Sequence, residues 1–151
     1  MVYYAYVHSL MSYGINFWGN SSHYIEIFKI QKRVIRIITK SGSKTSCRQL
    51  FKQLEILPLQ SQYILSTLQF VIKNKNLYTN NQNIHIINTR FNLDLHLPIC
   101  NLTLYQKGAY FSGIILFNHL PLSLKRLSND IKVFKPALQR FLKQHSYSIE
   151  E

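Results

Sequence analysis

The carboxylates of this chain form no pattern that could hold a catalytic cation. They are Glu26, Glu55, Asp94, Asp130, Glu150 and Glu151. Metal-dependent phosphoryl transfer needs several carboxylates gathered around divalent cations, and the chain has neither an Asp-Asp nor an Asp-x-Asp pair. It also lacks a glycine-rich phosphate loop and zinc-finger spacing, His96 and Cys100 being the nearest approach to a metal pair. We therefore predict no catalytic residue, no metal site and no cofactor.

Positive side chains gather instead on one predicted helix, residues 24–40. At about 100° per residue, five cations fall on one side of this helix. These five are Lys29, Lys32, Arg33, Arg36 and Lys40, and Lys44 adds charge in the following loop. The opposite stripe, predicted to be buried, comprises Ile27, Ile30, Val34, Ile37 and Ile38, with Gln31 beside it. Because lysine and arginine bind phosphates without reading sequence, these six cations are the predicted nucleic-acid-binding residues.

The overall charge agrees with a polyanionic partner. The chain carries 18 Lys+Arg against 6 Asp+Glu, a net charge of +12, which favours nucleic acid first and an anionic membrane second. Other predicted helices supply matching apolar stripes, and the chain has no apolar run of about 18 residues, so we predict no membrane partner. Two cysteines are too few for a disulfide framework and fit a reducing compartment, nucleus or cytoplasm.

Four helices are predicted in the first 74 residues, which indicates a compact bundle. The first covers residues 3–17, and Trp18 is expected to pack between it and the basic helix. The basic helix is expected to end at a left-handed Gly42. Ser46 to Gln49 has the pattern of a capping box, S-x-x-Q, and opens a short helix with Leu50, Phe51 and Leu54 inward. Pro58 precedes the fourth helix, over residues 59–73.

The remainder divides into two parts. Residues 75–101 are rich in asparagine and predict a linker or surface loop, in which the alternation from Phe91 to Leu97 suggests an extended segment lying on the bundle. Residues 102–151 predict helices over 105–120 and 134–144, the second with Pro136 in its first turn. The predicted fold class is mainly α: a small helical bundle (1–74), an irregular Asn-rich middle segment and a helical C-terminal part.

Short motifs follow one another in a consistent order along nearly the whole chain. They are Val7-His8-Ser9, Ser12-Tyr13-Gly14, Trp18-Gly19-Asn20-Ser21, Gln31-Lys32-Arg33, Arg36-Ile37-Ile38, Ser46-Cys47-Arg48, Leu50-Phe51, Ile56-Leu57-Pro58-Leu59, Asn88-Thr89-Arg90, Tyr105-Gln106-Lys107, Phe117-Asn118-His119-Leu120-Pro121 and Tyr147-Ser148-Ile149-Glu150-Glu151. In this order they resemble the C-terminal portion of reverse transcriptases encoded by jockey-like non-LTR retrotransposons. One departure is Val34, where the family more often has alanine.

The resemblance implies the thumb and the region beyond it, which follow the polymerase palm. Such a region helps to hold the primer–template duplex or the element's RNA, and the catalytic Mg²⁺ is bound elsewhere. The family's palm signature, an aromatic residue followed by x-Asp-Asp, is absent from this chain. The parent would be an RNA-directed DNA polymerase, and we expect this chain to be inactive alone and to depend on upstream polymerase domains. The uncapped apolar start, Val2 to Val7, is expected for a chain that continues upstream.

Two other interpretations stay open. In one, the chain is a structural or protein-docking helical module whose charge serves solubility. In the other, it is a stand-alone DNA-binding regulator of helix-turn-helix type, with residues 24–40 and 47–54 as the helix pair. The basic helix would then be the first member of the pair, whereas such proteins read DNA with the second.

Overall fold

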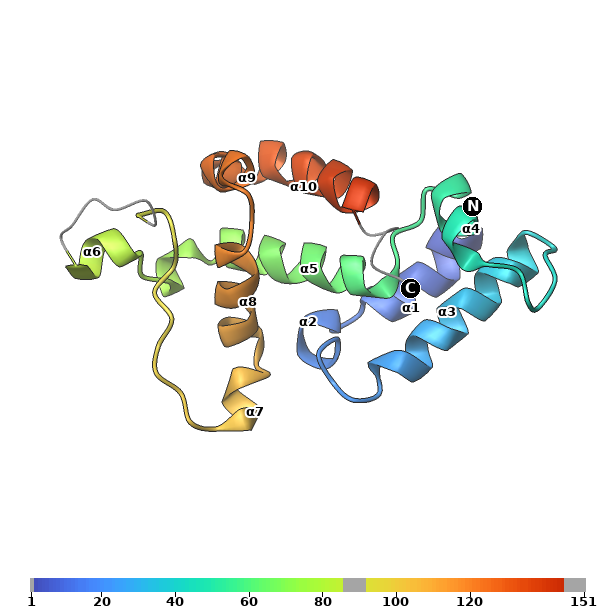
Figure 1. The fold of residues 1–151 in the computed structure, drawn as a ribbon, viewed down its shortest axis with the longest axis horizontal. Helices are drawn as coiled ribbons and strands as arrows, with labels where there is room; N and C mark the ends of the chain where they lie inside the picture. The colour runs from blue at the N-terminus through green and yellow to red at the C-terminus, as the bar shows by residue number, and fades with distance from the viewer. Residues whose placement is uncertain (1, 86–91, 146–151) are drawn as a thin grey trace. The chain divides into compact units, whose positions relative to one another are not determined.

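The computed structural model describes residues 2–85 and 92–145, and these form helices joined by loops (Figure 1). Within these residues the strand-type pairing amounts to a single isolated antiparallel bridge between Asn80 and Leu95. The predicted mainly-α fold class is therefore confirmed. No helix in the described part is long and apolar enough to span a bilayer.

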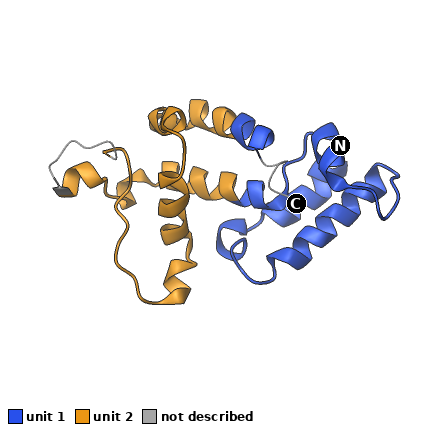
Figure 2. Cartoon of the chain, viewed as in Figure 1, with its two compact units in different colours: residues 1–63, 139–151 blue, residues 64–138 orange. Residues whose placement is uncertain are grey.

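The chain divides into two compact units (Figure 2). Unit 1 comprises residues 1–63 and 139–151, and unit 2 comprises residues 64–138. The predicted divisions after residues 74 and 101 both fall inside unit 2. Two helices, α5 (Leu59–Lys73) and α10 (Ile131–His145), contribute residues to both units.

Unit 1 begins with a helical segment that glycine interrupts. Its elements are the π-helical turns η1 (Tyr3–His8), then α1 (Ser9–Ser12), α2 (Ile15–Trp18), α3 (Tyr24–Ile38) and α4 (Cys47–Gln53), with the start of α5 and the end of α10. Gly14 has a φ of 61°, which an L side chain rarely adopts, so the predicted helix over residues 3–17 is broken there. Trp18 is only half-buried, and its indole N–H donates to the Tyr13 carbonyl at 2.8 Å.

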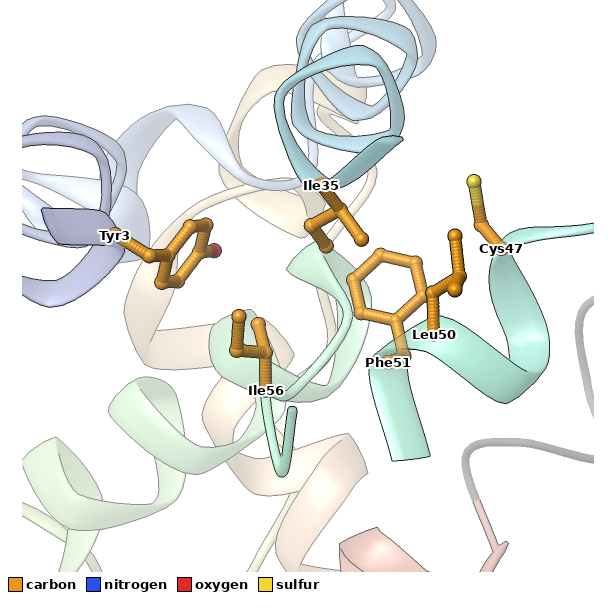
Figure 3. Close-up of a cluster of buried hydrophobic side chains, with 6 residues drawn as sticks. All are labelled: Tyr3, Ile35, Cys47, Leu50, Phe51 and Ile56. Atoms are coloured by element: carbon orange, nitrogen blue, oxygen red, sulfur yellow. The ribbon is translucent and has the colours of Figure 1, made fainter. Parts of the chain in front are cut away.

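The core of unit 1 lies between η1, α3, α4 and the turn after α4 (Figure 3). It comprises Tyr3, Ile35, Cys47, Leu50, Phe51 and Ile56, each no more than 8% exposed. The side chains converge from elements up to 53 positions apart in the sequence, Tyr3 and Ile56 among them. Leu50 and Phe51 are buried as predicted, and Leu54 is partly buried against the same cluster. Burial of this apolar surface is what holds α3 in place.

Two predicted helix ends differ from the structure. Gly42 is not left-handed; Lys40 takes that conformation, with a φ of 52°, because α3 ends at Ile38 and the reversal falls two residues later. The Ser41 N–H then donates to the Arg36 carbonyl at 2.9 Å, which closes the helix end. Ser46 does precede α4, but its side chain makes no capping hydrogen bond, so the predicted capping box is not formed.

Unit 2 is built from short helices around the second part of α5. They are η2 (Lys75–Leu77), α6 (Asn81–His85), α7 (Thr103–Gln106), α8 (Ala109–Asn118), α9 (Leu122–Arg126), η3 (Leu127–Asn129) and the start of α10. A Cβ added at Gly113 of α8 would lie 2.6 Å from the Cγ2 atom of Val71, so only glycine allows α8 to approach α5 this closely. The helix predicted over 105–120 is interrupted at Lys107 and Gly108.

The last helix begins earlier than predicted. It starts at Ile131, so Pro136 lies inside it and not in its first turn. The Asp130 carboxylate accepts a hydrogen bond from the Lys132 N–H at 2.8 Å, which is the interaction of a helix-capping residue and explains the earlier start.

The Asn118 carboxamide holds the extended residues around Leu95 against α8. Its Oδ1 atom accepts from the Leu95 N–H at 2.8 Å, and its Nδ2 atom donates to the Leu95 carbonyl at 2.9 Å. Leu95 is 4% exposed. Among residues 92–97, the backbone is thus satisfied by one side chain and one bridge and not by a sheet. Phe91, the first residue of the predicted segment, lies outside the described residues.

Candidate nucleic-acid interface

Helix α3 buries a different line of side chains from the one predicted. Gln31 and Ile35 are 2% and 0% exposed, whereas Ile30 and Ile37 are 56% and 68% exposed. The prediction that Ile30 and Ile37 are buried is therefore wrong. Phe28, which the predicted stripe left out, stacks on Phe51 of the core with ring centroids 6.2 Å apart. The helix is thus rotated so that the Gln31–Ile35 line faces the core.

Gln31 sets this rotation because its amide binds three partners from other elements. Its Nε2 atom donates to the Tyr3 hydroxyl at 2.8 Å and to the Leu57 carbonyl at 3.2 Å. Its Oε1 atom accepts from the Leu59 N–H, the first residue of α5, at 2.9 Å. A buried polar side chain is stable only when its hydrogen bonds are made, and here a single glutamine connects η1, α3 and α5.

Four of the six predicted cations are exposed. Lys29 and Arg33 lie on the side of α3 opposite the buried Gln31–Ile35 line, and Lys40 and Lys44 follow the end of the helix. Among the described residues none of the four has a carboxylate partner. We call these four residues the α3 basic surface. Two of these charges are thus on a helix that the core holds in position, and two are in the loop that follows it.

The other two predicted cations are half-buried and contact their own chain. The Lys32 ammonium lies 4.4 Å from the centroid of the Phe28 ring, a cation–π contact. The Arg36 Nε atom donates to the Thr45 carbonyl at 3.0 Å. Arg36 thereby ties the loop after α3, the loop that carries Lys44, back onto the helix. This contact uses one of the five N–H donors of the guanidinium.

The predicted set leaves out two cations that the fold brings to the same region. Arg48 and Lys52 are exposed on α4, which packs against α3: the Cys47 thiol lies 3.7 Å from the Lys32 carbonyl. A signal for them was present in the sequence, because no carboxylate occurs between Glu26 and Glu55. Because these two residues are on a different helix, the helical periodicity of residues 24–40 gave no indication of them.

The described residues contain no group of three histidine, cysteine, aspartate or glutamate side chains placed to hold a metal ion. Glu26 is the carboxylate that α3 itself carries. Glu26 lies in the first turn of α3, 77% exposed, and its carboxylate is 4.0 Å from the His23 ring. A negative charge at that end suits the helix dipole.

Comparison of the chain with protein-family models, with curated proteins and with solved structures finds no match. What the α3 basic surface can bind follows from its own chemistry. Exposed cations on one region of a surface attract polyanions such as nucleic acid.

Proposed function

We propose that this chain binds the sugar–phosphate backbone of nucleic acid through the α3 basic surface and performs no catalytic step itself. The observation that carries the proposal is a set of four exposed cations: Lys29 and Arg33 on α3, whose rotation a buried glutamine sets, and Lys40 and Lys44 in the loop after it. Backbone contacts of this kind give affinity and position without sequence preference.

The sequence resemblance gives this binding a context. In that context the chain is the thumb and post-thumb region of a retrotransposon reverse transcriptase, its partner is the primer–template duplex or the element's RNA, and upstream polymerase domains hold the Mg²⁺ ions. The net charge of +12 and the position of the Gln31-Lys32-Arg33 motif on the basic helix support this proposal.

The test is the salt dependence of binding to a labelled DNA duplex, followed by fluorescence anisotropy. Each phosphate contact contributes about −0.9 to the log–log slope of affinity against salt. The four residues of the α3 basic surface therefore predict a slope of about −3.6, and all six cations predicted from the sequence would give about −5. The triple variant Lys29→Ala, Arg33→Ala, Lys44→Ala should flatten the slope by about 2.7 units.

A matched control removes the same charge from unit 2. The triple variant Lys107→Ala, Lys132→Ala, Lys135→Ala replaces three exposed cations that lie on other helices or loops. It should leave most of the slope intact, because these residues are outside the α3 basic surface. Equal flattening by both triple variants would refute the assignment of this surface, since net charge alone would then explain the binding.

One observation favours a second function, protein docking. Apolar side chains recur every three or four residues from Val2 to Phe17 and are strongly exposed: Val2 67%, Tyr6 70%, Leu10 78%, Tyr13 85% and Phe17 81%. The chain has no lysine or arginine before Lys29, so this stripe suits an apolar protein surface and not phosphate. If docking is the sole function, the duplex titration should show no salt-dependent binding.

No observation favours the helix-turn-helix interpretation. Residues 39–46 connect α3 to α4, which is longer than the turn of about 3–4 residues that joins the helices of that motif.

A further inference from the structure

A pocket of about 230 Å³ lies in unit 2, and none of the residues that line it belongs to the α3 basic surface. Three cations line it: Lys75 from η2, and Lys125 and Arg126 from the end of α9. Leu95 and Phe117 supply the apolar part of its wall. The balance of charges around this pocket indicates which kind of ligand it could hold.

The carboxylates of unit 2 leave this pocket positively charged. Residues 64–138 contain two of them, Asp94 and Asp130. Asp94 pairs with Lys125 at 2.6 Å, and Asp130 accepts from the backbone N–H of Lys132. Among the described residues, Lys75 and Arg126 therefore have no carboxylate partner. The pocket carries three positive charges and one negative charge, which leaves about two to be compensated.

Lys75 is the side chain that most needs a counter-charge. Its ammonium donates to the Ser128 hydroxyl at 3.0 Å and to the Asn129 side-chain carbonyl at 3.0 Å, both of which are neutral acceptors. Burial lowers the pKa of Lys75, because the charged form loses hydration that these acceptors only partly replace. An ammonium has three N–H donors, so one remains for a ligand.

Lys125 is fixed in the wall of the pocket. Its side chain is 9% exposed, and its ammonium donates to Asp94 at 2.6 Å and to the Asn118 carbonyl at 2.7 Å. The Asn118 side chain in turn holds the backbone of Leu95, so the pair and the wall form one connected network. The third N–H of Lys125 is also left over. Two ammonium groups with one further donor each, and the Arg126 guanidinium in the same pocket lining, can donate hydrogen bonds to an anion.

We propose that this pocket binds the phosphate group of a small phosphate monoester. A dianion matches the two uncompensated positive charges, whereas a carboxylate would neutralise one. The Ser128 hydroxyl and Asn129 amide add neutral hydrogen bonds, and Phe117 and Leu95 can contact the organic part. The volume of about 230 Å³ is below that of typical ligand pockets of about 300–1,000 Å³, so the group attached to the phosphate is small. This proposal does not rest on the binding of nucleic acid by α3.

The test is isothermal titration calorimetry of the full chain with glycerol phosphate at about pH 8, where a phosphate monoester is close to a dianion because its second pKa is about 6. Saturable binding with one site is expected. Lys75→Met should weaken it by about tenfold or more, the loss of one charge-assisted hydrogen bond. Ser128→Ala, which keeps every charge and removes one neutral hydrogen-bonding group, should weaken it by a smaller factor.

The matched control is Lys73→Met, which removes the same charge from an exposed lysine two positions away, on α5. Its affinity for glycerol phosphate should equal that of the unmodified chain. The proposal is overturned if no saturation appears below about 10 mM, or if Lys73→Met loses as much affinity as Lys75→Met.

A second titration identifies the source of the phosphate by comparing a dinucleotide with and without a 5′-phosphate. Preference for the phosphorylated form, lost in Lys75→Met, assigns the site to a strand end, and tighter binding of glycerol phosphate assigns it to a free small molecule.

Discussion

Replacing Gln31 with leucine should destabilise unit 1, because leucine fills a similar volume but makes none of the three hydrogen bonds of the glutamine amide. The Tyr3 hydroxyl and the Leu59 N–H are buried together with Gln31, which is 2% exposed. The Leu57 carbonyl is half-buried and can regain water in the variant. The substitution thus leaves two buried polar groups without their partner.

Each buried polar group left unsatisfied costs about 1–3 kcal/mol, so we expect Gln31→Leu to lower the free energy of unfolding by about 3 kcal/mol. The gain from burying a more apolar side chain is of the order of 1 kcal/mol and is included in that figure. Burial also raises the pKa of the Tyr3 hydroxyl, while its hydrogen bond to Gln31 acts in the opposite direction.

The assay is urea denaturation followed by the fluorescence of Trp18, which lies in unit 1 with Gln31. With a denaturant slope of about 2 kcal/mol/M, the midpoint should fall by about 1.5 M. Gln53→Leu is the matched control, because Gln53 is an exposed glutamine of α4 in the same unit. An exposed substitution of this kind should change stability by less than about 0.5 kcal/mol.

A double-mutant cycle with Tyr3→Phe separates the hydrogen bond from packing. In the Gln31→Leu background, Tyr3→Phe removes the hydroxyl that has lost its partner, so it should cost nothing or restore stability. The two substitutions should therefore show a coupling energy of about 1 kcal/mol or more. The reasoning is refuted if Gln31→Leu costs no more than Gln53→Leu, or if the cycle shows no coupling.

Three further results are expected. Lys40→Gly should raise the free energy of unfolding by about 1 kcal/mol, because glycine adopts a positive φ without strain. The same variant should flatten the salt slope of duplex binding by about 0.9. A loss of stability would contradict the assigned helix end. Gly113→Ala should destabilise unit 2 by about 1–3 kcal/mol in thermal unfolding, and adding Val71→Ala should recover part of the loss by removing the clashing methyl group. Burial lowers the pKa of His8, so the unfolded chain takes up a proton more readily, and the free energy of unfolding should fall as pH drops through about 6.5. In urea unfolding at pH values on either side, His8→Gln should show a smaller fall than the unmodified chain. An equal fall would assign the effect to other groups.

Helices whose ends are set by residues such as proline could be predicted from the sequence. The helix predicted over residues 59–73 is found at Leu59–Lys73, because Pro58 cannot continue a preceding helix and suits the turn before a new one. Helix ends that depend on the exact position of the last turn were harder to predict from the sequence. The left-handed residue at the end of α3 is Lys40 and not Gly42, and the Ser41 N–H closes the helix end on the Arg36 carbonyl.

The sequence by itself determined the two-sided character of α3, which follows from residue types at helical spacing, and the lack of any carboxylate between Glu26 and Glu55. The tertiary structure alone decided which part of the apolar side is buried. Apolar side chains and Gln31 cover an arc of about 180° of α3, from Ile37 round to Phe28, and a helix can bury either half of so wide an arc. The Gln31–Ile35 half is the one buried, because there Gln31 makes hydrogen bonds with polar groups of Tyr3, Leu57 and Leu59. These partners are 26 and 28 positions away in the sequence, so the local pattern of α3 does not reveal them.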